Sequence, residues 1–325
     1  MLKIYASILC IVLVSGCASM KKPLQIPASM SSCVISEKAY LMDSLTMANA
    51  SKFNYDTTEA TKILPVRFTN RSITMARDLN LYGHLCEYTR LEIKNQNSPP
   101  SADFIALRQD FYQRIRIAED DIITNLAELD CEKTRILSLT NYLANYNQTR
   151  TNRATINAIL AGSLTAIIAG TAGLIDPDST NTIQQVSTIV GAVASAYYSF
   201  RAFGTKKKII YLHARNHLRE VWQRNLYSQI YSPSVWNFMC KVFRSKGKTS
   251  NGLDVIKEKW QQEDLLDEKD KNYKDKVQLL MGNGGNYSLD DLQNRLNMLV
   301  VIESEIDLMK YDLKRLQQEI MIGQK

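Results

Sequence analysis

The chain has 325 residues, of which 45% are hydrophobic and 22% charged, and its formal net charge is +7 at pH 7. This length allows a substantial core in one elongated or two compact domains. The basic excess is spread along the chain and indicates a solvated helical surface, with acidic lipid headgroups or cell-wall polymers as the alternative explanation. No nucleic-acid-binding module is recognisable, so we expect no nucleic-acid partner.

The first residues, MLKIYASILCIVLVSGCASM, have the layout of an export signal. One cation, Lys3, precedes an apolar run from Ile4 to Val14 that is too short to span a bilayer comfortably. The block Val14-Ser15-Gly16-Cys17 resembles the lipobox of bacterial lipoproteins. The resemblance implies that residues 1–16 are a signal peptide and that Cys17 is the lipid attachment site, first diacylated (as with palmitate) and then N-acylated. The alternative is an ordinary secretory signal or an uncleaved anchor.

The expected lipid anchor also predicts a location. Several acyl chains hold a protein firmly on a membrane. Ala18 and Ser19 follow the cysteine, and the lack of Asp there is similar to lipoproteins sorted to the outer membrane. We therefore expect a lipid-anchored protein of the bacterial cell envelope, on the periplasmic face of the outer membrane. Residues 17–34, which contain Pro23 and Pro27, are predicted to form a flexible tether.

Four cysteines remain once Cys10 leaves with the signal peptide and Cys17 is lipidated. An oxidising envelope would allow up to two disulfides among them, in three pairings, and buried free thiols are the alternative. No CxxC-like spacing occurs, so a metal site is not expected. The candidate disulfide cysteines are Cys33, Cys86, Cys131 and Cys240.

Proline and glycine outline the helices. Residues 35–97 are expected to hold two helices, about Ser36 to Lys52 and Arg71 to Lys94, separated by a polar stretch that contains Pro65. Beyond Pro99-Pro100 the chain has no proline before 177 and no glycine before 162, which permits a very long helix that starts near Ser101. Its apolar residues recur every seven positions, in one row of Ile115, Ile122, Leu129, Ile136 and Leu143 and an adjacent row of Phe104, Phe111 and Ala118.

Asp176-Pro177-Asp178-Ser179 is a strong stop and turn. A returning helix from Asn181 through Tyr231 would complete a long antiparallel hairpin over residues 102–231. The predicted fold class is therefore all-α, an elongated helical bundle built around this hairpin and a C-terminal coiled-coil helix.

The tip of the hairpin, residues 154–200, is apolar and rich in small residues. Its two uncharged runs are long enough to cross a bilayer, but the cations that flank them would violate the positive-inside rule for a resident inner-membrane hairpin. Three interpretations remain: tight packing within the chain, a self-association surface, or conditional entry into a membrane. The candidate residues for an interaction or membrane tip are Gly162, Ile168, Gly170, Gly173 and Gly191.

The C-terminal part is predicted to contain loops around a charged helix, residues 232–287, and then a coiled-coil helix, residues 288–322. Loops are expected at Arg244 to Asn251 and at Gly282 to Asn286. We favour a partner helix within the same chain over a second copy, and we find no strand alternation. The coiled-coil rows are Leu292, Leu299, Ile306, Leu313 and Ile320, and then Ile302, Met309 and Leu316.

Residues with catalytic or metal-binding potential are few. His213, His217 and Glu220 would share a face if they lay on one helix, but Ala214 stands where a zinc-protease motif needs its Glu. We expect a polar helix face there, with no metal, no cofactor, no enzymatic activity and no small-molecule substrate. The sequence predicts a lipid-anchored scaffold or accessory subunit that acts through helical protein–protein interaction, either by self-association or with an envelope protein as partner. The alternative is a membrane-active, pore-former-like protein.

Overall fold

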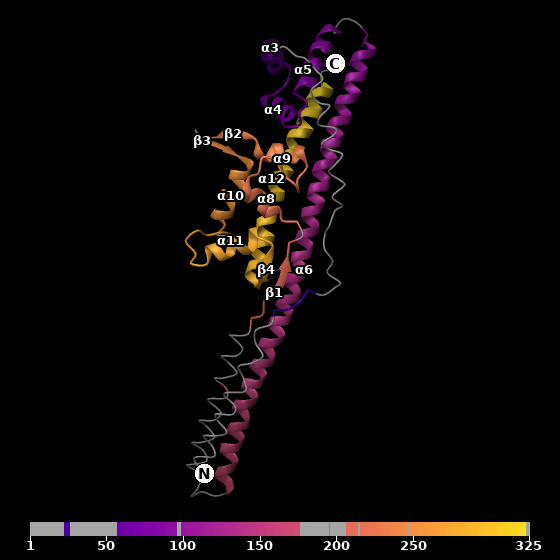
Figure 1. Ribbon diagram of the computed structural model, residues 1–325. Helices are drawn as coiled ribbons and strands as arrows, with labels where there is room; N and C mark the ends of the chain where they lie inside the picture. Colours follow the sequence, from indigo (N-terminus) through magenta and orange to yellow (C-terminus); the bar gives the residue numbers. More distant parts are fainter. Residues whose placement is uncertain are drawn as a thin grey trace. The chain divides into compact units, whose positions relative to one another are not determined.

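A computed structural model describes most of the folded body (Figure 1). Helices dominate the described residues and the strands among them are short, which confirms the predicted all-α class. The chain divides into two compact units, which we describe separately. The described residues are 23–26, 57–95, 99–175, 195, 206–213, 215–245 and 248–322. Unit 1 comprises Met1–Met30, Ser138–Tyr211 and Gly285–Leu292, and unit 2 comprises Ser31–Leu137, Leu212–Gly284 and Gln293–Lys325.

Helix α6, Ala102–Ile175, is the longest element, with 74 residues. At 1.5 Å per residue it reaches about 110 Å. It begins where the sequence predicted, because the backbone N–H of Phe104 donates to Ser101 Oγ at 3.2 Å and so satisfies one of the free donors of the first turn. No kink-forming proline interrupts it.

The C-terminal helix α12, Leu289–Ile322, packs on the first part of α6 within unit 2. Lys133 Nζ on α6 lies 2.5 Å from Glu303 Oε2, and Gln317 Nε2 donates to Glu119 Oε1 at 2.6 Å. The predicted intramolecular partner is therefore confirmed. Every member of the four predicted heptad rows is buried, at 8% exposure or less.

In the part of the chain before α6 that the structure describes, three shorter helices occur: α3 (Thr57–Arg67), α4 (Asn70–Asp78) and α5 (Tyr82–Lys94). Pro65 lies inside α3 rather than in a polar connection. Proline has no N–H to donate to the carbonyl four residues earlier, and α3 ends two residues after it. The single helix expected from residue 71 to 94 is broken at Asn80, whose φ of 57° is left-handed. The helix expected at residues 36–52 lies outside the described residues.

The prediction of a returning helix through Tyr231 is wrong for residues 206 onward. Strand β1, Ile209–Leu212, is followed by helix α8, His217–Gln223, and after a turn by α9, Pro233–Cys240. β-Branched and aromatic side chains in IIYL favour a strand, and its side chains alternate in burial. Its length of four residues hides that alternation in the sequence.

Two predicted loops also contain short strands. β2 (Val242–Ser245) and β3 (Lys248–Asn251) form an antiparallel pair where a flexible loop was expected. β4 (Gly284–Tyr287) pairs with β1. Between them lie α10 (Gly252–Gln262), which starts with a capping box of Asn251 and Asp254, and α11 (Tyr273–Met281).

The segment 23–26 is held against β1 in unit 1. Leu24 forms a parallel bridge with Ile209. The backbone N–H of Leu24 donates to the carbonyl oxygen of Lys208 at 2.9 Å, and the N–H of Ile210 donates to the carbonyl oxygen of Leu24 at 3.0 Å. This contact lies within the stretch for which the sequence predicted a tether.

Candidate functional site

The histidine pair of HARNHLRE does not lie on one helical face. His213 precedes α8, whose N-cap is Asn216, so the helical spacing to His217 does not apply. His213 Nδ1 lies 3.0 Å from the carbonyl oxygen of Gly282 and 3.0 Å from Asn216 Nδ2. Burial, and then the charge of Arg295, lower the pKa of His213 to about 3, so the imidazole is neutral.

His217 and Glu220 belong to the packed interior of unit 2. The ring of His217 packs edge-on against Tyr231, with centroids 5.3 Å apart, and Glu220 accepts a hydrogen bond from Ser228 Oγ at 2.9 Å. Complete burial raises the pKa of Tyr231 well above 10. Among the described residues, no group of three or more His, Cys, Asp or Glu side chains could hold a metal ion.

A buried ionic network joins α6 and α12 with the segment just before α8. Arg295, fully buried on α12, donates to the carbonyl of Leu280 at 3.1 Å and lies 3.4 Å from Glu132 on α6. Arg215 Nε lies 2.6 Å from Glu128 Oε1, one helical turn before Glu132. Such pairs specify which helix faces meet, and they provide no nucleophile with a matched base.

The sequence did contain a signal for this network. Arg295 stands seven residues before Ile302, and Glu132 continues the row of Phe104, Phe111 and Ala118 at the same spacing. A charged residue at a seam position in each of two helices predicts that the two charges meet inside the seam. The rows were predicted as apolar, and three polar members were missed: Arg295, Glu132 and the buried Asn125 between Ala118 and Glu132.

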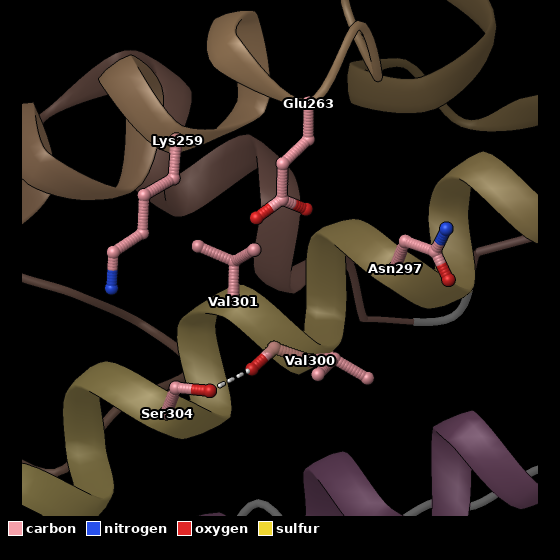
Figure 2. Close-up of a pocket in the computed structure, with 6 residues that line it drawn as sticks. All are labelled: Lys259, Glu263, Asn297, Val300, Val301 and Ser304. Carbon is pink, nitrogen blue, oxygen red and sulfur yellow. Dashed lines mark hydrogen bonds between the residues drawn. The ribbon is translucent and has the colours of Figure 1, made fainter.

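A pocket of about 300 Å³ lies between α10 and α12 in unit 2 (Figure 2). Trp260 of α10 fixes the two helices together, since its indole N–H donates to the carbonyl of Met298 at 3.1 Å. Figure 2 shows Val301 between the side chains of Lys259 and Glu263. The lining residues are Lys259, Glu263, Asn297, Val300, Val301 and Ser304.

The pocket combines an apolar floor with one charge of each sign. The ammonium of Lys259 lies 3.8 Å from Glu305, and burial raises the pKa of that carboxyl above its usual range. The Ser304 hydroxyl donates to the carbonyl of Val300 at 2.8 Å, which leaves it poorly placed to act as a nucleophile. Four of the six lining residues are polar or charged, so the pocket suits a partner side chain that is part apolar and part polar, and its lining offers no nucleophile with a matched base.

The pocket continues into an apolar stripe on the outer face of α12. Val300, Leu308 and Tyr311 are 43 to 71% exposed, and their spacing of eight and three residues puts them on one side of the helix. The opposite side of α12 carries the buried heptad rows. Ser304 lies on the same side between Val300 and Leu308, so the stripe is interrupted by one polar residue. Exposed apolar side chains gathered on one side of an already packed helix indicate an interaction surface.

The predicted hairpin tip is only partly described. Gly162, Ile168, Gly170 and Gly173 lie in the helical backbone of α6, but their side chains, and all of Gly191, are outside the described residues. Just before them, α6 exposes an apolar row of three large residues, at 53 to 64% of their surface, while Ala158 on the other side is buried. The members of this apolar row are Ile156, Ile159 and Leu160.

None of the helices searched in the described part of the chain combines the length and the hydropathy of a bilayer-spanning segment.

The cysteines fall into two groups. Cys131 is disulfide-bonded. Cys86 and Cys240 are free thiols, and burial raises the pKa of both, to about 11 for Cys86, so neither is a reactive thiolate. Cys17 and Cys33 lie outside the described residues.

Comparison of the chain with protein-family models, with curated proteins and with solved structures gives no match.

Proposed function

We propose that this protein is a lipid-anchored scaffold or accessory subunit of a bacterial envelope assembly, and that it acts by binding a helical protein partner. The observation that carries this proposal is the outer face of α12, where an apolar stripe runs into a pocket. Val300, Leu308 and Tyr311 supply large aliphatic and aromatic contact area on a rigid helix. Anchors of this kind contribute most of the binding energy in helix-in-groove interfaces.

The geometry favours a helix as the occupant. The stripe runs from Val300 to Tyr311, a distance of about 16 Å at 1.5 Å per residue, which matches three turns of a partner helix. The pocket beside Val300 has room for one aliphatic side chain of that helix. Lys259 and Glu263 at its rim would pair with charges of either sign and so set the register of the partner.

Two features support an exported, lipid-anchored form. Val14-Ser15-Gly16-Cys17 resembles a lipobox, and acylation of Cys17 would hold the chain on the membrane. The disulfide at Cys131 suits an oxidising compartment such as the periplasm, where disulfides persist. Ala18 and Ser19, which follow Cys17, support an outer-membrane location, and we also propose a non-enzymatic role.

The partner surface is testable by photo-crosslinking in the native host. A photoreactive residue at Asn297 or Ser304, on the rim of the pocket, should give discrete crosslinked species. Leu308→Glu should remove those species without lowering the melting temperature, because Leu308 is 49% exposed. Leu137→Glu is the matched control, since Leu137 on α6 is 48% exposed. Equal crosslinking in the two glutamate variants would contradict a partner on α12.

The second candidate function is membrane activity of the hairpin, and the exposed apolar row of Ile156, Ile159 and Leu160 favours it. A pore-former should release dye from vesicles, and Ile159→Asp should abolish the release by placing a charge in the hydrocarbon. A scaffold should leave vesicles intact.

A further inference from the structure

The part of α6 that belongs to unit 1 carries positive charge without compensation. From Ser138 to Ile175 its sequence contains two arginines, Arg150 and Arg153, and no acidic residue. Arg153 is exposed, and Arg150 lies over the ring of Tyr146 with its guanidinium 5.9 Å from the ring centroid.

Three lysines lie beside these arginines. The backbone N–H of Lys207 donates to Asn147 Oδ1 at 2.9 Å, which fixes Lys206-Lys207-Lys208 one helical turn from Arg150. We call Arg150, Arg153, Lys206, Lys207 and Lys208 the cationic collar. In the described part of the chain, Arg150, Arg153, Lys206 and Lys208 form no ion pair. Their charge is therefore available to an external anion.

The exposed face of α6 changes character along its length. Gln148 and Asn152 are exposed and polar, Arg153 is exposed and cationic, and the apolar row of Ile156, Ile159 and Leu160 follows. Water, charged headgroups and hydrocarbon follow one another in the same order at a membrane surface. Long cationic side chains beside an apolar segment reach the headgroup region in helices that enter a bilayer surface.

The amino-terminal chain limits how far the collar can lie from an anchor at Cys17. The backbone of Leu24 is hydrogen-bonded to Lys208 and Ile210, so Lys208 of the collar lies next to the amino-terminal segment. Cys17 precedes Leu24 by seven residues, which span at most about 25 Å at roughly 3.5 Å per residue. A lipid anchor at Cys17 would therefore hold the collar close to the headgroups at high effective concentration.

We propose that the cationic collar and the apolar row together bind the anionic phospholipid headgroups of the bilayer in which Cys17 is anchored. Of the proposed function, this inference uses only the lipid anchor at Cys17. The acyl chains give one attachment and the collar a second, which fixes unit 1 against the membrane surface. A second copy of the chain is a poorer occupant, because two collars of five cations would repel each other.

The test is flotation with vesicles. The mature chain, residues 17–325 with Cys17→Ser, should bind vesicles with 30% phosphatidylglycerol and bind neutral phosphatidylcholine vesicles far more weakly. Each basic residue near an anionic surface contributes about fivefold in partitioning. Replacing Arg153, Lys206 and Lys208 with Gln should therefore weaken binding by roughly 100-fold. High salt should weaken the binding of the parent chain in the same direction.

The matched control removes three other exposed lysines, Lys269, Lys271 and Lys314, by the same change to Gln, and should leave binding within about twofold of the parent. Circular dichroism should show equal helicity in all variants. Equal binding to anionic and neutral vesicles, or equal loss in the two triple variants, would overturn the proposal. So would an Ile159→Asp variant that changes the sedimentation coefficient and not vesicle binding, because a second copy would then occupy the row.

Failure of the anchor is measured separately, by mass spectrometry of the full chain purified from its host. An unmodified Cys17 there would defeat the proposed function, whereas the vesicle result with Cys17→Ser depends only on the collar and the apolar row.

Discussion

At the scale of single residues, buried polar groups of unit 2 hold its helices and loops together through hydrogen bonds. Asn216 caps α8 through a hydrogen bond to the backbone of Arg219, and its amide also donates to the carbonyl of Leu280 at 2.9 Å. His213 completes this junction by contacting Gly282. The bonds to Leu280 and Gly282 join elements that are more than 60 residues apart in the sequence, so they hold the junction together.

The depressed pKa of His213 predicts how stability depends on pH. Its pKa is about 3 in the folded chain and 6.5 when unperturbed, so the unfolded state binds the proton first. Stability from this group is complete above pH 6.5 and falls as the pH is lowered toward 3, by at most about 1.4 kcal/mol per pH unit. His213→Asn, which keeps a donor at the Nδ1 position, should flatten this part of the profile. Urea unfolding of both proteins between pH 4 and 7 measures the difference, and parallel profiles would contradict the assignment.

At the scale of elements, the sequence predicted the elements that repeat and missed those that do not. α6 and α12 extend over many heptads, so five-membered rows from Ile115 and from Leu292 identified their buried sides. β1 has four residues and no period to read. The break at Asn80 depends on a left-handed backbone that Asn merely tolerates. The pocket between α10 and α12 requires tertiary packing by Trp260, which no local pattern reveals.

The contact between Arg295 and Glu132 predicts a coupled effect of two substitutions on the α6–α12 seam. The guanidinium of Arg295 is fully buried and contacts Glu132, Asn216 and the carbonyl of Leu280. Arg295→Met removes it and should lower the free energy of unfolding by about 3–5 kcal/mol. Adding Glu132→Leu should recover part of that loss, because the second substitution removes a buried carboxylate that has lost this cation.

A double-mutant cycle in urea measures the coupling, which should exceed about 1 kcal/mol. Lys310→Met is the control on the same helix, since Lys310 is half exposed, and should change stability by less than about 0.5 kcal/mol. Strictly additive effects would show that the two charges do not interact.

At the scale of the whole molecule, the disulfide at Cys131 links the fold to its proposed location. Cys131 is exposed on α6, where its side chain adds nothing to the core, so the bond itself is the contribution that the residue makes. Cys86 and Cys240 are free thiols, and each is partly buried. A chain that folds after export would form the bond at Cys131, and the same chain retained in a reducing cytosol would lack it.

Expression with and without residues 1–16 separates these two cases. Alkylation under denaturing conditions should label Cys86 and Cys240 in the exported protein and leave Cys131 unlabelled until a reductant is added. In the form retained in the cytosol, the alkylating reagent should label Cys131 without any reductant.

Loss of the disulfide should lower the free energy of unfolding by about 2–4 kcal/mol. The cytosolic form should therefore melt several degrees lower, and oxidation should restore its melting temperature. Cys131→Ser should melt like the reduced protein and stop responding to oxidant. Labelling of Cys131 in the exported protein before any reductant is added would contradict both the disulfide and the oxidising location. An exposed thiol that is still reduced after export has not been oxidised in its compartment.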